Sequence, residues 1–454
     1  MNTIKTMKSF SIGRLLKPGV CIVLLSASLD VLQAQTGHNA TLSLTLNDAI
    51  RHAKNSNKLV GVLKTEQAAN GLDLEDARMG VLPRVHSNAS YQRYTNVTVF
   101  DGVWSDPKGI PKPPVPDAGA LSLEAGFNLY AGGRQRAVIT DMQHKHELAS
   151  INTKEQESNI GLQVALQYLD LIRLYFQEQL ITDQIERAKT RAKNISSFYT
   201  NGKVTKSDLL RAEVQLSNVL LNEIANKNDY LVSNQRLNTL LNIDPYTKII
   251  PSDTVSLNLQ DSLELAALLK DYSSTFSILK AQKNIELQEN RTKLAKSFNL
   301  PAVSLFAGYG FNYPNTMIFP PVAQTIAVGT AGVKITYEIS SLYHNKHRVR
   351  SSRLREAALK DQKGWIEDNV KQEAQALAIK YNEAMNRLTV IKKSIEQAEI
   401  NYNIQNTKYV NQLTLLTDLL EADNLYQETQ FNYIQANIAA LSIYYRLLFI
   451  TGKL

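Results

Sequence analysis

The sequence predicts a mainly helical protein with a smaller β portion, built from two halves that follow the same plan. Tyr199–Glu213 matches Tyr409–Asp423 without a gap, at an offset of 210 residues. Residues 134–199 contain no proline and one glycine, which favours a single, nearly continuous helix. Residues 121–129 alternate apolar and polar side chains, which is typical of a strand with one apolar face. We therefore expect each half to run helix, β-hairpin, long helix, return helix.

The first 34 residues are expected to be a secretory signal peptide. Basic residues up to Lys17 precede an apolar run from Val20 to Leu29, and the run leads to a cleavage site after Ala34. This run is about half the ~20 residues that a spanning helix needs. The single cysteine, Cys21, lies within the peptide, so the mature protein is expected to lack thiol chemistry, zinc–thiolate sites and disulfides.

Any membrane crossing by the mature chain is expected to use strands. No later stretch approaches 18 apolar residues, and a closed β-barrel is the other structure that pairs every peptide group within lipid. Hairpins are predicted at residues 84–130 and 301–339, with exposed tips at 101–116 and 314–321. Four strands are too few to close a barrel, because such barrels begin at about eight. Several chains must therefore contribute strands to one barrel.

The domain boundaries follow from the repeat. Residues 35–242 form the first structural repeat and residues 263–454 the second, and the proline-bearing segment 243–262 reads as a linker. Each repeat is expected to begin with one helix, at 46–79 and 264–296, that ends just before a Leu-Pro pair. These Leu-Pro pairs lie 218 residues apart.

The return helices carry a heptad pattern, which predicts packing as coiled coils. In the second repeat the positions are Ala422, Tyr426, Thr429, Tyr433, Ala436, Ala440, Ile443, Leu447 and Ile450. In the first repeat the same phase gives Ala212, Leu216, Val219, Glu223, Asn226, Tyr230, Ser233, Leu237 and Leu240. Residues 160–180 carry two offset apolar stripes, whereas a helix of a solid bundle would carry one. Helices with neighbours on two sides suit a curved wall.

Several sequence motifs, taken together and in their order along the chain, resemble those of the TolC family of outer-membrane efflux proteins. They are a helix ending at Leu-Pro, a hairpin, the glycine pair in Asn128–Arg134, a long helix, and Tyr-x-x-Gly-x-x-x-x-x-Asp-Leu-Leu-x-Ala, with the whole plan duplicated. The resemblance covers essentially the whole mature chain. It implies a homotrimer whose 12-stranded barrel contacts outer-membrane lipid and continues into a periplasmic α-helical barrel. It also implies a periplasmic adaptor (membrane fusion) protein and an inner-membrane pump as partners.

The same resemblance implies a function and a gate. The family members are channels of tripartite efflux or type I secretion systems, passive conduits rather than enzymes, and they need no cofactor. By motif match, Asp418 and Glu421 occupy the periplasmic constriction, Asp208 the corresponding place in the first repeat, and Tyr409 a gate-linking position. The simpler reading of the carboxylates is an ordinary acidic first turn of a helix, which stabilises by a few tenths to about 1 kcal/mol.

The turns between long and return helices are the expected adaptor contacts. Their residues are Asn201, Gly202, Lys203, Asn411, Gln412 and Leu413. Two departures from the family pattern leave the latch of the gate open: Thr414 stands where a basic residue can occur, and Gln412 replaces the glycine retained as Gly202. The motif Glu338–Tyr343 also lacks the glycine pair found at the end of the first hairpin.

Other constellations predict little. His144 and His146 diverge on a helix, and His344 and His347 lack the glutamate of a zinc-protease motif, so no metal site is expected. The basic run 344–355 suits a solvated helix face or membrane headgroups, and nucleic acid is not expected outside the inner membrane. A non-conducting, periplasm-spanning tether is the alternative function, because strands could serve only as an anchor. A secreted enzyme is disfavoured for want of a catalytic motif.

Overall fold

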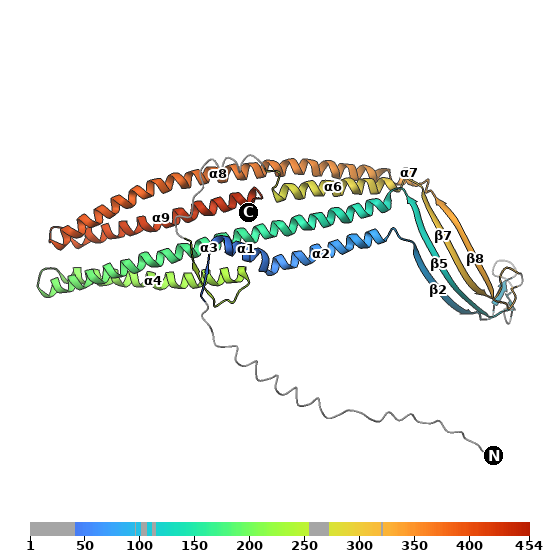
Figure 1. Ribbon diagram of the computed structural model, residues 1–454, viewed down its shortest axis with the longest axis horizontal. Helices are drawn as coiled ribbons and strands as arrows, with labels where there is room; N and C mark the ends of the chain where they lie inside the picture. Colours follow the sequence, from blue (N-terminus) through green and yellow to red (C-terminus); the bar gives the residue numbers. More distant parts are fainter. Residues whose placement is uncertain (1–40, 96, 101–106, 111–114, 254–271, 319–320) are drawn as a thin grey trace, which may run out of the picture.

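The computed structural model describes residues 41–95, 97–100, 107–110, 115–253, 272–318 and 321–454. This part of the chain is an elongated stack of helices that ends in a β-sheet (Figure 1). The predicted signal peptide, residues 1–34, lies outside the described residues, and so do residues 254–262 of the predicted linker.

Two very long helices run along the molecule, and each is followed by a return helix. α3 spans Arg134–Thr200 and α8 spans Lys346–Val410, and they are paired with α4 (Lys206–Leu241) and α9 (Leu416–Ile450). The continuous helix predicted over residues 134–199 is confirmed. At ~1.5 Å per residue, α3 alone extends about 100 Å. Within the described ranges, no helix combines the length and the apolar character that a membrane span requires.

The single helix predicted over residues 46–79 is wrong. The structure has two helices there, α1 (Leu46–Ser56) and α2 (Lys58–Met79), separated by Asn57. Asn57 is extended, with φ −64° and ψ 131°, and its side-chain oxygen accepts a hydrogen bond from the Leu59 backbone N–H at 2.9 Å. An asparagine cap satisfies a free N–H at the start of a helix, so it favours the break.

The break exists because α4 stacks end to end on α2 (Figure 1). Ser56 Oγ donates to the Leu241 carbonyl at 2.8 Å, and Asn57 Nδ2 donates to the Leu240 carbonyl at 2.9 Å. The last carbonyls of a helix have no partner within it. Here Ser56, the last residue of α1, and Asn57, the N-cap of α2, supply those partners and join α4 end to end with α2.

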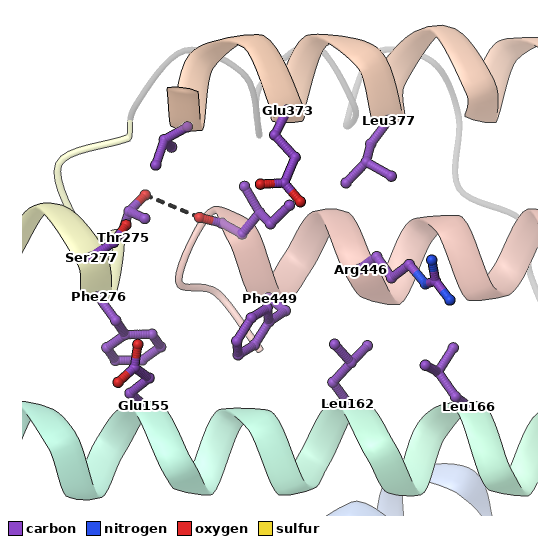
Figure 2. Close-up of a pocket in the computed structure, with 12 residues that line it drawn as sticks. Glu155, Leu162, Leu166, Thr275, Phe276, Ser277, Glu373, Leu377, Arg446 and Phe449 are labelled. Carbon is purple, nitrogen blue, oxygen red and sulfur yellow. Dashed lines mark hydrogen bonds between the residues drawn. The ribbon is translucent and has the colours of Figure 1, made fainter. Parts of the chain in front are cut away.

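The second repeat has the same junction between α9 and α6 (Phe276–Ser297). Ser274 Oγ donates to the Thr451 carbonyl at 2.9 Å, and Thr275 Oγ1 donates to the Ile450 carbonyl at 3.0 Å, a contact drawn in Figure 2. The predicted helix 264–296 therefore begins later, at Phe276, and the part of it before residue 272 lies outside the described residues.

One antiparallel sheet caps the helical rod. Its strand order is β2 (Arg84–Arg93), β5 (Asp117–Ala131), β7 (Ala302–Tyr313) and β8 (Ile326–Thr336). Each predicted hairpin supplies two neighbouring strands, and β5 pairs with β7 across the two halves of the chain. Within the described chain, the outer edges of β2 and β8 carry no partner strand.

The register places apolar side chains in one row across the sheet. Leu123 lies opposite Tyr309, and Leu121 lies opposite Phe311; all four are about half exposed. The alternating positions form the other face, where Glu124 lies opposite Gly308. In antiparallel pairs, residues directly opposite share a face, so the alternation read from the sequence extends over the whole sheet.

Short strands occur in two segments that the sequence did not identify as strands. β4 (Pro107–Ile110) lies inside the tip predicted as a loop at residues 101–116, and it pairs with β3 (Val97–Phe100), which precedes that tip within the predicted hairpin 84–130. β6 (Lys248–Pro251), within the predicted linker, pairs in parallel with β1 (Thr41–Leu44). Four-residue strands are too short to show a period, which is why the pattern missed them.

The glycine pair before α3 has a steric reason. Gly132 has φ +63°, and a Cβ there would lie 2.5 Å from the Ser297 carbonyl oxygen. The second half lacks this pair and instead has a short helix, α7 (Ser341–His344), before α8.

The helices bury two seams rather than one. In α9, the heptad position Leu447 packs with Tyr381 of α8, and the heptad positions Ala436 and Ala440 pack with Leu388 of α8. A second stripe of α9, which includes Ile438, packs with α3 in the main core. Neighbours on two sides are what the two apolar stripes in residues 160–180 predict.

Candidate functional site

The turn between α3 and α4 closes the end of the first helix pair that lies farthest from the sheet (Figure 1). The Gly202 N–H donates to the Tyr199 carbonyl and the Lys203 N–H to the Phe198 carbonyl, both at 2.9 Å. Gly202 has φ +70°, and Asn201 Nδ2 donates to the Ser197 carbonyl at 2.7 Å. This is the bonding pattern of a glycine-terminated helix.

The turn between α8 and α9 repeats this pattern without the glycine. The Gln412 N–H donates to the Tyr409 carbonyl at 2.9 Å, and the Leu413 N–H donates to the Lys408 carbonyl at 2.8 Å. Gln412 has φ +62°, a left-handed conformation that glutamine rarely adopts. The backbone of the turn is therefore preserved although the sequence departs from glycine. Asn411 Nδ2 donates to the Thr407 carbonyl, which completes the correspondence.

Asp208 acts in a capping box at the start of α4. Its backbone N–H donates to Thr205 Oγ1 at 3.2 Å, and its Oδ2 accepts from the Thr205 N–H at 3.1 Å and from the Thr205 hydroxyl at 2.7 Å. Such a box satisfies free N–H groups at a helix start. The simpler reading of this acid, stabilisation of a first turn, therefore has a structural basis.

Asp418 occupies the same place in α9 and makes different contacts. Thr414 Oγ1 donates to Asp418 Oδ2 at 2.7 Å, while the N-cap residue, Leu415, has no side-chain hydrogen bond. The Thr414 hydrogen bond lowers the pKa of the Asp418 carboxyl below its usual value. The carboxylate is therefore held ionised close to the turn. Glu421 lies one turn later and is exposed.

Tyr409 is buried beside both turns. Only 9% of its surface is exposed, and it packs with Ile195, Leu416 and Leu419. Burial raises the pKa of the Tyr409 hydroxyl, and the nearby Asp208 carboxylate adds to the effect. The Tyr409 hydroxyl has no hydrogen-bond partner among the described residues.

A buried ion-pair cluster near these turns was missed by the sequence analysis. Arg191 Nη2 lies 2.6 Å from Asp423 Oδ2, and Arg187 Nε lies 3.2 Å from Asp423 Oδ1. The Asp423 side chain is 2% exposed and that of Arg191 is 7% exposed. The cluster joins α3 of the first half to α9 of the second. The repeat aligns Asp423 with Glu213, and no spacing in the sequence pairs either one with α3.

A cavity of about 420 Å³ lies next to this cluster, between α3, α8 and α9. Its lining includes the two arginines together with Glu186, Tyr402 and Tyr409. The Arg187 guanidinium lies 5.8 Å from the centre of the Tyr402 ring, so it stacks as a cation on an aromatic face.

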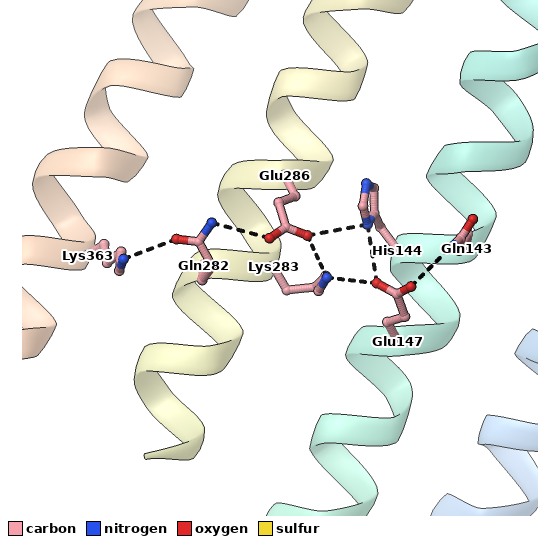
Figure 3. Close-up of polar contacts among 7 residues, drawn as sticks. All are labelled: Gln143, His144, Glu147, Gln282, Lys283, Glu286 and Lys363. Carbon is pink, nitrogen blue, oxygen red and sulfur yellow. Dashed lines mark hydrogen bonds and ion pairs between the residues drawn. The ribbon is translucent and has the colours of Figure 1, made fainter. Parts of the chain in front are cut away.

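A second polar cluster links the repeats closer to the sheet (Figure 3). Lys283 Nζ lies 2.7 Å from Glu147 Oε2 and 2.5 Å from Glu286 Oε2, and His144 Nδ1 approaches the same two oxygens. His144 and the two glutamates have the spacing of metal ligands. The Lys283 ammonium already bridges the two carboxylates, so the cluster is an ion-pair network with its positive charge in place.

In the sequence, His144 stands out only together with His146. The sequence pattern missed the glutamate three residues away and the one on α6, because only the fold brings α6 alongside α3.

Another cavity, of about 470 Å³, lies where α9 stacks on α6 (Figure 2). Its lining is mostly apolar and comes from α3, α6, α8 and α9, with Leu162 and Phe449 among its residues. It is far along the rod from the two turns, and no predicted site residue lines it.

The comparisons with known proteins agree with this architecture. Residues 49–242 match the family model described as "Outer membrane efflux protein". No curated protein matches the sequence. The outer-membrane channel OprN is 18% identical with a TM-score of 0.72, over 90% of each chain. VceC from Vibrio cholerae is 17% identical with a TM-score of 0.73, over 90% of this chain and 96% of its own.

CusC, whose structures concern folding and transmembrane channel formation, is 13% identical with a TM-score of 0.75, over 91% of this chain and 93% of its own. At these identities the solved structures establish a shared fold, and the family model covers residues 49–242, which is less than half of the 454-residue chain. Residues 49–242 therefore match the outer membrane efflux protein family, and the described chain has the TolC-like fold of these solved channels.

Proposed function

We propose that the protein is the outer-membrane channel of a tripartite efflux or type I secretion system. In this proposal it is a passive conduit for small molecules, and a periplasmic adaptor protein and an inner-membrane pump supply selection and energy. The observation that carries the proposal is a four-stranded sheet with an exposed apolar face, joined to helices about 100 Å long. A channel that crosses the outer membrane and the periplasm needs both the membrane sheet and the long helices.

The proposed assembly is a homotrimer. Peptide groups along the outer edges of β2 and β8 need partners before the sheet can lie in lipid, where each unpaired group costs several kcal/mol. Pairing β2 of one copy with β8 of the next supplies those partners, and three copies give twelve strands. The apolar row that includes Leu123 and Tyr309 then faces outer-membrane lipid.

The proposed gate lies at the two turns. Three copies of Asp418 and Glu421 around one axis would place six carboxylates at a narrow pore entrance, where they attract cations. These like charges repel one another, so the closed state lasts only while the helices stay packed. We propose the exposed residues of both turns as the adaptor contacts; they are Asn201, Gly202, Lys203, Asn411, Gln412 and Leu413. We also propose that the chain consists of two structural repeats, joined by a linker at residues 243–262.

Conductance of the purified trimer in planar bilayers tests the channel and its gate together. The wild-type trimer is expected to conduct weakly, and Asp418→Ala with Glu421→Ala is expected to raise conductance several-fold. Asp368→Ala with Glu383→Ala is the matched control, because it removes the same charge from exposed positions of α8. Equal conductance of both double variants would contradict the proposed gate but not the proposed channel.

The alternative, a non-conducting tether across the periplasm, makes a different prediction in the same experiment. A tether conducts nothing in any variant, including the one without gate carboxylates. The sheet would then anchor the chain without enclosing a pore.

A further inference from the structure

We infer that the cavity between α3, α8 and α9 is a binding site for a small oxyanion such as phosphate, held by Arg187, Arg191 and Tyr409. This cavity, between α3, α8 and α9, is a different site from the gate carboxylates that we propose, Asp418 and Glu421. Nothing in the proposed conduction mechanism requires such a site.

Three unpartnered donors carry the inference. Arg187 Nη2, Arg191 Nη1 and the Tyr409 hydroxyl are buried, and none has a hydrogen-bond partner within the described chain. All three residues line the same cavity of about 420 Å³. A buried donor without a partner costs about 1–3 kcal/mol, and more for a charged group. Three such donors at one cavity indicate an acceptor that belongs there.

The charge of the cluster agrees with an anion. Arg187 and Arg191 share one carboxylate, that of Asp423, and these two arginines are 25% and 7% exposed in their side chains. Two guanidinium groups against one carboxylate leave an excess positive charge in a largely buried place, which is unfavourable without a further anion. Planar guanidinium groups match the geometry of an oxyanion.

The other charged groups nearby set limits on the affinity. Glu186 lines the same cavity and forms no ion pair with the described residues, and the Asp208 carboxylate lies near Tyr409. Both repel an anion, so binding in the millimolar range is expected. Burial raises the pKa of the Tyr409 hydroxyl, which therefore stays protonated and remains a donor at neutral pH.

The consequence is a bridge between the two repeats. Arg187 and Arg191 belong to α3, whereas Tyr409 belongs to α8. An oxyanion held by all three would tie α3 to the end of α8 and stabilise the packed arrangement of the turns. Separation of α3 from the end of α8 would release the oxyanion.

Titration calorimetry of the full-length trimer with inorganic phosphate tests the site. Tyr409→Phe removes only the hydroxyl, whose loss costs little because no described residue forms a hydrogen bond with it. The expected result is saturable binding to wild type and at least a several-fold weaker affinity in Tyr409→Phe. Tyr199→Phe is the matched control, because Tyr199 holds the equivalent place in the first turn, is 39% exposed, and does not line the cavity. Its affinity should equal that of wild type.

Two results would overturn the inference. Absence of saturable heat in wild type would mean that water alone satisfies the three donors. Equal affinities of wild type and Tyr409→Phe would place phosphate elsewhere on the surface. Neither result bears on conductance, so the failure of this site and the failure of the channel proposal are distinguishable.

Discussion

Arg191 of α3 and Asp423 of α9 form a buried ion pair, with 2.6 Å between Nη2 and Oδ2, that fastens the first half of the chain to the second. The two residues are 232 positions apart in sequence. Asp423 lies five residues beyond the proposed gate residue Asp418. Any movement that separates α9 from α3 near the turns must therefore break this pair.

The first prediction concerns Asp423→Asn. Removing one partner of a buried ion pair leaves uncompensated charge, which costs about 3–5 kcal/mol. The variant should unfold at a clearly lower temperature than wild type, measured by circular dichroism of the detergent-solubilised trimer. Glu383→Gln is the control, because its pair with Lys380 is more than half exposed on both sides and solvent screens exposed pairs. Equal effects of the two variants would contradict a stabilising role for the buried pair.

The second prediction concerns the left-handed residues of the turns. Gly202→Ala should destabilise by about 1 kcal/mol, because an added Cβ meets no neighbour and only the backbone conformation, φ +70°, opposes it. Gln412→Gly should stabilise by roughly 0.5 kcal/mol, since it relieves the same strain at φ +62° at some cost in chain entropy. Thermal unfolding of both variants measures the two signs. A loss of stability in Gln412→Gly would show that the glutamine side chain makes contacts worth more than the strain.

The third prediction concerns pH and the Lys283 cluster. The hydrogen bond from Lys283 lowers the pKa of Glu147 below its usual 4.5. Burial raises the pKa of Glu286, but hydrogen bonds from Lys283 and Gln282, together with the nearby Lys283 charge, lower it overall. Carboxyls with a lowered pKa in the folded state stabilise it above about pH 4.5 and lose this contribution as pH falls further. Wild type should therefore lose more thermal stability between pH 5 and about pH 3 than Lys283→Met.

The control for that prediction is Lys380→Met, which removes a lysine from an exposed pair. Its pH dependence should follow wild type. If Lys283→Met also follows wild type, the cluster does not contribute to the acid sensitivity of the fold.

The fourth prediction concerns Thr414, which stands where the family can have a basic residue. Its hydroxyl lowers the pKa of Asp418, so Thr414→Val should raise that pKa toward its usual value. Cation selectivity of the conducting trimer depends, in our proposal, on ionised Asp418. Selectivity should therefore be lost at a higher pH in Thr414→Val than in wild type, measured as reversal potential against pH.

Thr407→Val serves as the comparison for this variant, because among the described residues the Thr407 hydroxyl bonds only to a backbone carbonyl of its own helix, that of Asn403. Its selectivity profile should match wild type. Coincident profiles for all three proteins would mean that Asp418 does not set selectivity.

The sequence was informative wherever a period or a repeat extends over many residues. The long helix at 134–199, the alternation of residues 121–129 and the heptad of α9 are each repeated signals, and the structure has a helix, a strand and a packed seam there. The sequence pattern did not predict features that depend on a single residue or on a very short segment. Asn57 breaks a helix that the period continues through, and β6 is too short to have a period.

The sequence by itself determined the local elements and the equivalence of the two turns, because these depend on neighbours within a few residues. Only the tertiary structure decided that Arg191 meets Asp423 and that Lys283 bridges glutamates from two helices. It also decided that Tyr409 lines one cavity with two arginines, where buried donors have no hydrogen-bond partner among the described residues. These contacts join helices far apart in the chain, so no spacing encodes them. They arise from how the repeats pack together, which depends on the whole buried surface at once.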